Sequence, residues 1–310
     1  MKRYTNANTY DNQVPSVVTV GTFDGVHIGH RKIIDRLIES AERNGLDSVI
    51  LTFFPHPRMV LQQDSGIKLI NTIDERIQIL EKTKLSSVII HPFTKEFSRL
   101  TAGEYVQKIL VNLLNTKHII IGYDHRFGRN RNSNIIDLAS YGMKNNFTVE
   151  EISKQDIDDV AVSSTKIREA LLEGDITKAN SYLGYEFMLT GTVQKGKKLG
   201  RKLNYPTANL HIEEQYKLIP KNGVYIVKST IDNKTYFGMM NIGTNPTVNG
   251  TQQTIETHFF DASFNLYDKK IQIQMLKRIR DEKKFSSIEE LQEAMQKDED
   301  FSRDYINTLV

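Results

Sequence analysis

The chain has 310 residues, 39% of them hydrophobic, and a formal net charge of +3, so it is long enough for two domains. The weak positive charge fits small polyanionic ligands but does not favour nucleic acid as a partner. The absence of cysteine excludes a disulfide framework and a cysteine-ligated metal. Residues 1–12 lack the apolar core of a signal peptide, and no apolar run approaches the roughly 20 residues of a membrane span. We therefore expect a cytoplasmic protein without a membrane partner.

Up to about Gly184, apolar strand-like runs alternate with segments of helical periodicity. Strands are predicted at 17–20, 48–54, 87–91, 117–122 and 148–152, and helices at 31–43, 74–82, 103–114 and 134–144. Thr101 and Glu104 fit a capping box at the start of the third helix. The alternation predicts a doubly wound parallel sheet, whose ligands bind beyond the carboxyl ends of its strands.

The first strand leads into the sequence GTFDGVHIGH at residues 21–30, which reads as a glycine-rich turn before a helix. Glycines let the backbone approach a ligand, and a helix N-terminus offers free N–H groups to a phosphate. A lone histidine here would more often be structural, but His27 and His30 together could donate hydrogen bonds to phosphate oxygens. Candidate nucleotide-binding residues in the turn are Gly21, Phe23, Asp24 and Gly25.

Two further strand ends carry unusual residues. After the second strand, Phe54, Pro55 and His56 form a rigid loop that exposes the histidine and the following Arg58. After the fourth strand, the sequence GYDHRFG at 122–128 places the polar Asp124 at the same edge of the sheet.

A third candidate lies at the start of a helix that ends near Gly174. The hydroxyl run Ser163, Ser164 and Thr165 precedes the cations Lys166 and Arg168. Serine is commonplace as a helix cap, but hydroxyls, free N–H groups and two cations together make a good phosphate clamp.

These motifs carry a resemblance to a known family. The stretch 21–30 resembles the start of the prokaryotic bifunctional riboflavin kinase/FMN adenylyltransferases, and His27 to His30 resembles the HxGH signature of nucleotidyltransferases. The stretch 162–168 is similar to their Ile-Ser-Ser-Thr-x-Ile-Arg motif, with Val162 for isoleucine. The resemblance implies that Asp124 contacts ATP phosphates and that the Phe54–His56 loop contacts flavin or phosphate. His125 stands where the family usually has phenylalanine.

From about Tyr185 the pattern changes to short β-branched and aromatic runs, at 187–193, 224–230, 236–242, 254–260 and 270–275. Asp232, Asn233 and Lys234 read as a hairpin turn. A last helix is predicted after Ser286, with Ser287 and Glu290 as a capping box and Ile288, Leu291 and Met295 on one face. This favours an antiparallel sandwich or barrel, and hence domains at 1–184 and 185–310.

Two stretches of the second half carry chemistry. Between Lys195 and Lys202 lie five cations and two glycines, followed by Thr207 and Asn209 on one side of an extended segment. The charges alone fit a solvated basic loop, but a hydroxyl and an amide oxygen suit a Mg²⁺ that carries ATP phosphates. Downstream, Glu256 and His258 alternate with apolar residues and therefore share one face of a strand.

The second half resembles the riboflavin kinases of the same family. Residues 200–209 are similar to Gly-Arg-x-Leu-Gly-x-Pro-Thr-Ala-Asn, with Asn204 for the second glycine, and Glu256 stands where these kinases have the base for the ribityl hydroxyl. The resemblance implies nucleotide contacts at Lys197, Gly200 and Arg201. A closing segment of the type Arg-x-Glu-x-x-Phe begins at Arg280, a candidate flavin contact.

The family implies two reactions: phosphorylation of riboflavin to FMN by MgATP in the second domain, and adenylylation of FMN to FAD in the first. The expected catalytic residues are His27, His30, Arg168 and Glu256; the expected ligands are ATP, riboflavin, FMN and FAD. Two alternatives remain. Another nucleotidyltransferase, such as a cytidylyltransferase or a tRNA synthetase fragment, would have no place for the second half. An RNA-binding protein would interleave aromatic residues with its cations.

Overall fold

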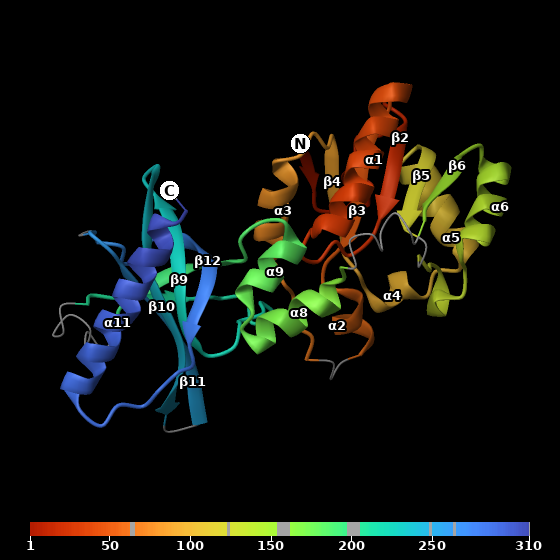
Figure 1. Ribbon diagram of the computed structural model, residues 1–310. Coiled ribbons are helices and arrows are strands. Elements are labelled where there is room, and N and C mark those ends of the chain that lie inside the picture. The colour runs from red at the N-terminus through yellow and green to blue at the C-terminus, as the bar shows by residue number, and fades with distance from the viewer. Residues whose placement is uncertain are drawn as a thin grey trace. The chain divides into compact units, whose positions relative to one another are not determined.

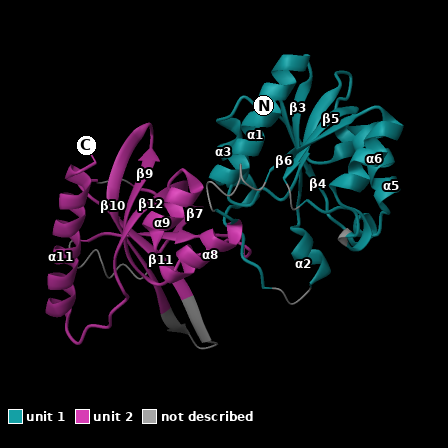
Figure 2. Cartoon of the chain, turned by 45° about the vertical axis from the view of Figure 1, so that its right-hand side comes forward, with its two compact units in different colours: residues 1–163 teal, residues 164–310 magenta. Residues whose placement is uncertain are grey.

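The computed structural model describes residues 1–62, 66–122, 125–153, 162–196, 205–247, 250–262 and 265–309. The chain divides into two compact units, residues 1–163 (unit 1) and 164–310 (unit 2), shown in Figure 2. Each is described here by itself. Among the described residues no helix is both long and apolar enough to cross a membrane.

Unit 1 is built on a parallel sheet with the strand order β1-β4-β3-β2-β5-β6. Its strands are β1 (Lys2–Tyr4), β2 (Ser16–Val20), β3 (Asp47–Phe53), β4 (Ser87–His91), β5 (Thr116–Gly122) and β6 (Thr148–Ile152). The five predicted strands are confirmed to within one residue at each end. The edge strand β1 escaped prediction because it is a short polar segment without alternation.

The helices of unit 1 are α1 (Ile28–Asn44), α2 (Pro57–Leu61), α3 (Ile73–Glu81), α4 (Lys95–Ser98), α5 (Ala102–Tyr105) and α6 (Ile135–Asn145). The helix predicted at 103–114 is α5 continued by a π-helical segment, η2 (Val106–Leu113). Its capping box is confirmed, since Glu104 N donates to Thr101 Oγ1 and Thr101 N donates to Glu104 Oε2. The short helices α2 and α4 offer too few residues to show a period.

Both faces of the sheet are buried. Val18, Leu51 and Ile119 point to a core shared with Tyr105 and η2, whereas their neighbours along the strands are buried on the opposite face, where α1 packs. The carboxyl ends of β2, β3, β4 and β5 therefore form one edge, at which the loops after these strands begin (Figure 1).

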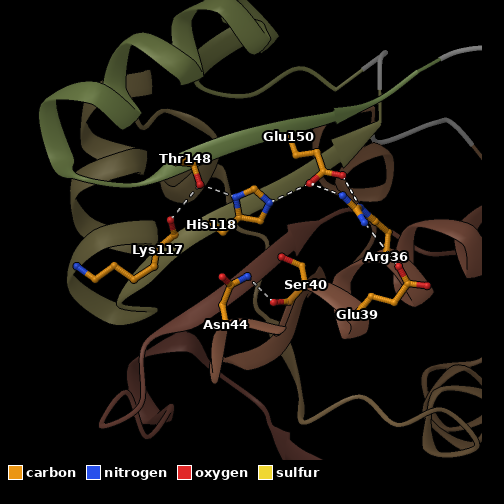
Figure 3. Close-up of polar contacts among 8 residues, drawn as sticks. All are labelled: Arg36, Glu39, Ser40, Asn44, Lys117, His118, Thr148 and Glu150. Carbon is orange, nitrogen blue, oxygen red and sulfur yellow. Dashed lines mark hydrogen bonds and ion pairs between the residues drawn. The ribbon is translucent and has the colours of Figure 1, made fainter. Parts of the chain in front are cut away.

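A polar network fixes α1 to the edge of the sheet, as Figure 3 shows. Arg36 Nε donates to Glu150 Oε1 at 2.6 Å, and the other oxygen of Glu150 lies 3.2 Å from His118 Nε2. His118 Nδ1 in turn contacts the hydroxyl of Thr148 on β6. The pairs are partly exposed, so their contribution to stability is modest, but they tie the helix that begins at His27 to β5 and β6.

Unit 2 is a closed antiparallel barrel with the strand order β10-β11-β8-β7-β12-β9. Its strands are β7 (Met188–Gln194), β8 (Ala208–His211), β9 (Gly223–Ile231), β10 (Lys234–Thr247), β11 (Gly250–Phe259) and β12 (Lys270–Arg280). The barrel confirms the predicted architecture, and positive φ angles at Asp232 and Asn233 confirm the hairpin turn. β8 was recognised from the sequence only as an extended segment.

Helices α8 (Ser164–Glu173) and α9 (Ile176–Leu183) precede the barrel and bond to it. Asn180 Nδ2 donates to Met275 O at 2.9 Å, and its Oδ1 accepts from Phe187 N at 2.7 Å; Lys221 N donates to Leu171 O. The contacts therefore divide the chain at 163/164, whereas the boundary expected from periodicity lies at 184.

The last helix, α11 (Ile288–Asn307), differs from the prediction in two details. Ser287 caps it by accepting from Glu290 N, but Glu290 Oε2 accepts from Ser286 and not from the Ser287 backbone, so the capping box is incomplete. Ile288 is 56% exposed, because the apolar contacts of α11 with the barrel begin one turn later, at Leu291 and Met295.

Candidate active sites

The turn that follows β2 has a constrained backbone. Gly25 has φ 89°, and the non-glycine residues Phe23 and Val26 have φ 47° and 35°. At the two non-glycine residues such angles cost on the order of 1–3 kcal/mol each and persist only where the surroundings enforce them. Hydrogen bonds do so here: Thr52 Oγ1 donates to Thr22 O at 3.1 Å, and Gly21 N donates to Leu51 O at 3.1 Å.

Asp24 is at the centre of these constraints and is 1% exposed. Its carboxylate accepts hydrogen bonds from Ile70 N and Asn71 N at 3.0 to 3.3 Å. Arg76 of α3, 2% exposed, places its NH2 3.5 Å from Asp24 Oδ1. The carboxylate thus has partners inside the protein, and its predicted contact with the nucleotide remains a prediction.

His27 and His30 lie together at the start of α1. His27 is the N-cap residue, and its Nδ1 accepts from His30 N at 3.3 Å. The two rings stack with centroids 3.7 Å apart, and Phe23 lies 5.0 Å from His30. Burial, then the neighbouring His27 and Arg76, hold the pKa of His30 well below its usual range. His30 is therefore held in the neutral form, and His27, whose Nδ1 accepts a hydrogen bond, keeps Nε2 as its N–H donor at the helix N-terminus.

An aromatic cluster occupies the carboxyl ends of β3 and β4. Phe53 lies within 5.4 to 6.5 Å of His91, Phe93 and Phe97, and Phe97 leads on to Tyr105 at 6.1 Å. Phe127, in the loop after β5, lies 5.9 Å from Tyr105 and 6.2 Å from His125. Phe53, Tyr105 and Phe127 are buried, so the cluster belongs to the hydrophobic core of unit 1.

The loop after β3 differs from the prediction in the burial of His56. His56 was expected to be exposed, but it is 8% exposed and caps α2 by accepting from Arg58 N at 3.2 Å. The cap requires the ring to fold back over the helix, which the sequence alone did not indicate. Pro55 is exposed and Phe54 is half-buried.

The predicted phosphate clamp spans the junction of the two units. Ser163 is the last residue of unit 1, and Ser164, Thr165 and Arg168 begin unit 2 on the first turns of α8. That these clamp residues form one site with His27 and His30 remains a prediction.

In unit 2 the structure brings the predicted kinase residues together. Asn209 on β8 pairs in register with Glu256 on β11, and Thr207 Oγ1 donates to Glu256 Oε2 at 3.2 Å. Gly196 lies against Asn209: a Cβ added there would meet the amide at 2.4 to 2.6 Å. Glu256 and His258 are part-exposed between the buried Ile255, Thr257 and Phe259, as the alternation predicted.

A pocket of about 520 Å³ lies beside this group, within unit 2. Tyr205, Pro206 and His258 line one side, and Gln292 and Gln296 of α11 line another. Tyr205 Oη donates to Gln296 Oε1 at 3.2 Å, and burial together with the neighbouring Glu299 raises the pKa of Tyr205 to about 12. The pocket combines a ring surface with polar side chains.

Arg280, the candidate flavin contact, is held inside unit 2. Its guanidinium forms a bidentate pair with Asp298 of α11, with contacts of 2.6 to 3.1 Å, and NH1 donates to Asp281 O. The pair fixes the end of β12 to α11. A role in flavin binding stays a prediction.

Comparison with known proteins gives two family models, one for each half of the chain. The FAD synthetase model matches residues 9–166, and the riboflavin kinase model matches residues 183–306. Bifunctional riboflavin kinase/FMN adenylyltransferases are similar over nearly the whole length. The one from Buchnera aphidicola of Schizaphis graminum is 39% identical, over 95% of this chain and 95% of its own. That of Listeria monocytogenes is 35% identical, over 96% and 94%.

This chain belongs to the bifunctional riboflavin kinase/FMN adenylyltransferase family. A solved structure described as a macrolide-efflux protein from Streptococcus pneumoniae has a TM-score of 0.87, covers 97% of this chain and 98% of its own, and is 29% identical. The fold is therefore shared along the whole chain.

Four family-predicted positions, Asp124, Lys197, Gly200 and Arg201, lie outside the described residues, as does Asn204. Conversely, sequence reasoning missed Arg76, Tyr105, Gly196 and Tyr205. Arg76 reads as an ordinary helical cation. Only the proximity of Gly196 and Tyr205 to the Pro-Thr-Ala-Asn stretch could have drawn attention to them.

Proposed function

We propose that the two halves of this enzyme of flavin cofactor biosynthesis catalyse successive steps, each at its own site. Unit 2 transfers the γ-phosphoryl group of ATP to the 5′ hydroxyl of riboflavin. The site around His27 and His30 then transfers AMP from ATP to the FMN phosphate. The observation that supports the assignment most directly is the grouping of Thr207, Asn209 and Glu256 in the unit that matches the riboflavin kinase model.

In the kinase step Glu256 accepts the proton of the ribityl hydroxyl as the oxygen attacks the γ-phosphorus and ADP leaves. A hydroxyl and an amide oxygen, both on part-exposed residues beside that carboxylate, fit a hard cation. Thr207 and Asn209 would hold Mg²⁺, which supplies neutralisation of the phosphate charge when bound. The neighbouring pocket at Tyr205 and Pro206 is then suited to the adenosine half of the nucleotide.

In the adenylylation step an oxygen of the FMN phosphate attacks the α-phosphorus of ATP, and pyrophosphate leaves. The attacking oxygen carries no proton that a base must remove, so stabilisation of negative charge dominates. His27 and His30 supply N–H donors, and the N-terminus of α1 adds its dipole.

The experiment is an incubation of the full chain with riboflavin, ATP and MgCl₂, followed by chromatography of the flavins. We expect FMN to appear first and FAD to follow, and supplied FMN to give FAD without riboflavin. Formation of neither product would overturn the proposal. Formation of FMN alone would leave the second unit's assignment standing and remove that of the first.

A further inference from the structure

Arg76 is a fully buried cation in the middle of unit 1, next to the glycine-rich turn. It is 2% exposed, and its NH2 lies 3.5 Å from the equally buried Asp24. Its NH1 donates to Thr52 Oγ1 at 3.4 Å, and this hydroxyl itself donates to Thr22 O at 3.1 Å. Through Asp24 and Thr52, one guanidinium is thus linked to two residues of the turn.

Stability alone does not explain such a pair. Replacing a buried ion pair by apolar residues of similar volume is often neutral or even stabilising. The turn would also keep hydrogen bonds that do not involve Arg76, such as those from Ile70 N and Asn71 N to Asp24. A buried cation held at this position therefore calls for a second role.

The hydrogen bonds of His27 and His30, which follow the turn, favour neutral imidazole rings. An imidazolium has two N–H donors, whereas Nδ1 of His27 is needed as the acceptor for His30 N. Nδ1 of His30 is buried and has no hydrogen-bond partner within the described part of the chain. Protonating either ring would break the cap or bury an unsatisfied donor, and the stacked rings, 3.7 Å apart, would repel each other.

We propose that Arg76 is a positioning residue for the adenylylation site: its contacts to Asp24 and Thr52 hold the turn that leads into His27, and its fixed charge helps to keep the ring of His30 neutral. The proposal rests on the function assigned above to this pair. Among the described residues, the titratable or charged groups that act on His30 are His27 at the start of its own helix and Arg76 from α3. Asp24 on the turn partly offsets the charge of Arg76.

The direction of the effect follows from the sign of the charge. Arg76 is one of the causes that lower the pKa of His30, so removing the guanidinium must raise that pKa. With Arg76 present, FAD formation from supplied FMN is expected to show no acid limb from His30 between pH 6 and 8. Without it, the rate falls as the pH drops through the raised pKa, because the protonated ring leaves the stacked arrangement.

The test compares Asp24→Asn with the double variant Asp24→Asn/Arg76→Met in the full chain. Both lack the carboxylate and the ion pair, and neither has an uncompensated buried anion. They differ in the buried cation and in its hydrogen bond to Thr52. The readout is the titration of the ¹⁵N-labelled histidine side chains by NMR, with the His30 signal assigned by its loss in His30→Asn. We expect the pKa of His30 to be higher in the double variant than in Asp24→Asn.

Equal His30 titration in the two variants would overturn the proposal. Should the double variant not fold, Arg76→Lys serves instead: it keeps the charge but loses the planar fork, so the titration stays as in the wild type while FAD formation slows. A His30 pKa raised in Arg76→Lys would likewise refute the role of charge. Arg3→Met, which removes an exposed ion pair with Asp74 of the same helix α3, is the matched control and should leave the titration unchanged.

The role of Arg76 and the function proposed for the His27/His30 site can be refuted separately. The NMR titration needs no substrate, so it decides the role of Arg76 even if the wild type made no FAD. Absence of FAD formation in the wild type would refute the proposed function alone. Phosphorylation of riboflavin, measured on each variant, should be unaffected because its residues lie in unit 2.

Discussion

The two candidate sites differ in how their residues are held. His27 and His30 directly follow a turn that has three positive φ angles and carries a buried ion pair, and their rings stack on each other. Asn209 and Glu256 project from the strands β8 and β11, and Thr207 directly precedes β8. All three are part-exposed, and Thr207 donates a hydrogen bond to Glu256. One site is preorganised by the protein. The other, in the proposed function, is completed by the nucleotide and its metal.

The difference matches the chemistry proposed for each. Stabilising charge on a leaving pyrophosphate requires fixed donors whose orientation costs nothing at the moment of reaction. A base that must take a proton from a bound hydroxyl needs only to lie within hydrogen-bond reach, and substrate binding can adjust it. Variants in the two sites should therefore have distinct consequences for binding, turnover and pH dependence.

The largest effect is expected at Glu256. Glu256→Gln keeps a hydrogen-bond acceptor for Thr207 but removes the base, so kcat of FMN formation should fall by about 10²–10⁴. Binding of MgATP should be nearly unchanged, as measured by isothermal titration. FAD formation from supplied FMN, assayed on the same preparation, is the control. Wild-type kinase turnover would eliminate Glu256 as the base.

His30→Ala should have the next largest effect. Loss of one preorganised donor typically costs about 10²–10³ in rate, so FAD formation from FMN should fall by that factor. FMN formation from riboflavin should continue at its normal rate. If both activities fell equally, the assignment of this motif to adenylylation would be refuted.

Asn209→Ala tests whether the amide of Asn209 contributes to MgATP binding in the candidate kinase site of unit 2. Loss of one polar contact to a charged group costs roughly 1.5–3 kcal/mol, or about ten- to a hundredfold in the Kd of MgATP. The matched control is Thr207→Ser, which retains the hydroxyl and should change that Kd little. An unchanged Kd in Asn209→Ala would show that the amide does not hold the metal.

The sequence predicted well those features that repeat along the chain. The strands of unit 1 show as apolar runs because both faces of the sheet are buried, and Glu256 and His258 share a face because the period of a strand is two. Thr207, Asn209 and Glu256 were singled out from family motifs, and in the structure they are neighbours; their roles stay predictions.

What escaped prediction depends on distant contacts. Nothing near Arg76 in the sequence shows that it lies beneath a turn some fifty residues earlier, at Asp24. The same holds for His56, whose burial follows from its role as a cap, and for α9, whose bonds to Met275 join residues 95 positions apart. Periodicity reports which face of an element is buried, but not which partner covers it.

The division of the chain can be tested with fragments 164–310 and 185–310. The longer one keeps α8 and α9, with buried Ile167, Leu171, Ile176 and Leu183, and their bonds to the barrel. Since burying each large aliphatic side chain contributes about 1.5–3 kcal/mol, we expect the shorter fragment to melt at least roughly 10 °C lower. Both should phosphorylate riboflavin if the functional boundary lies at 184. Equal Tm values would show that α8 and α9 are not part of the second fold.

The smallest expected effect is a change in the pH dependence of the Tm of one unit without a change in the other. Hydrogen bonds from the Thr101 backbone and hydroxyl, with Lys108, lower the pKa of Glu104 to about 2, and Lys283 with Ser286 does the same for Glu290. A carboxylate with a depressed pKa stabilises the fold above its unfolded value near 4.5, and this contribution is lost as the pH falls towards 2. Glu104→Gln should therefore lower the Tm of unit 1 slightly at pH 7 and make it less sensitive to acid. Glu290→Gln should do so for unit 2.

Calorimetry of each variant between pH 7 and 2 measures the effect, with Glu42→Gln on the exposed surface of α1 as the control. A change in both thermal transitions from one substitution would show that the two units unfold together rather than as separate domains.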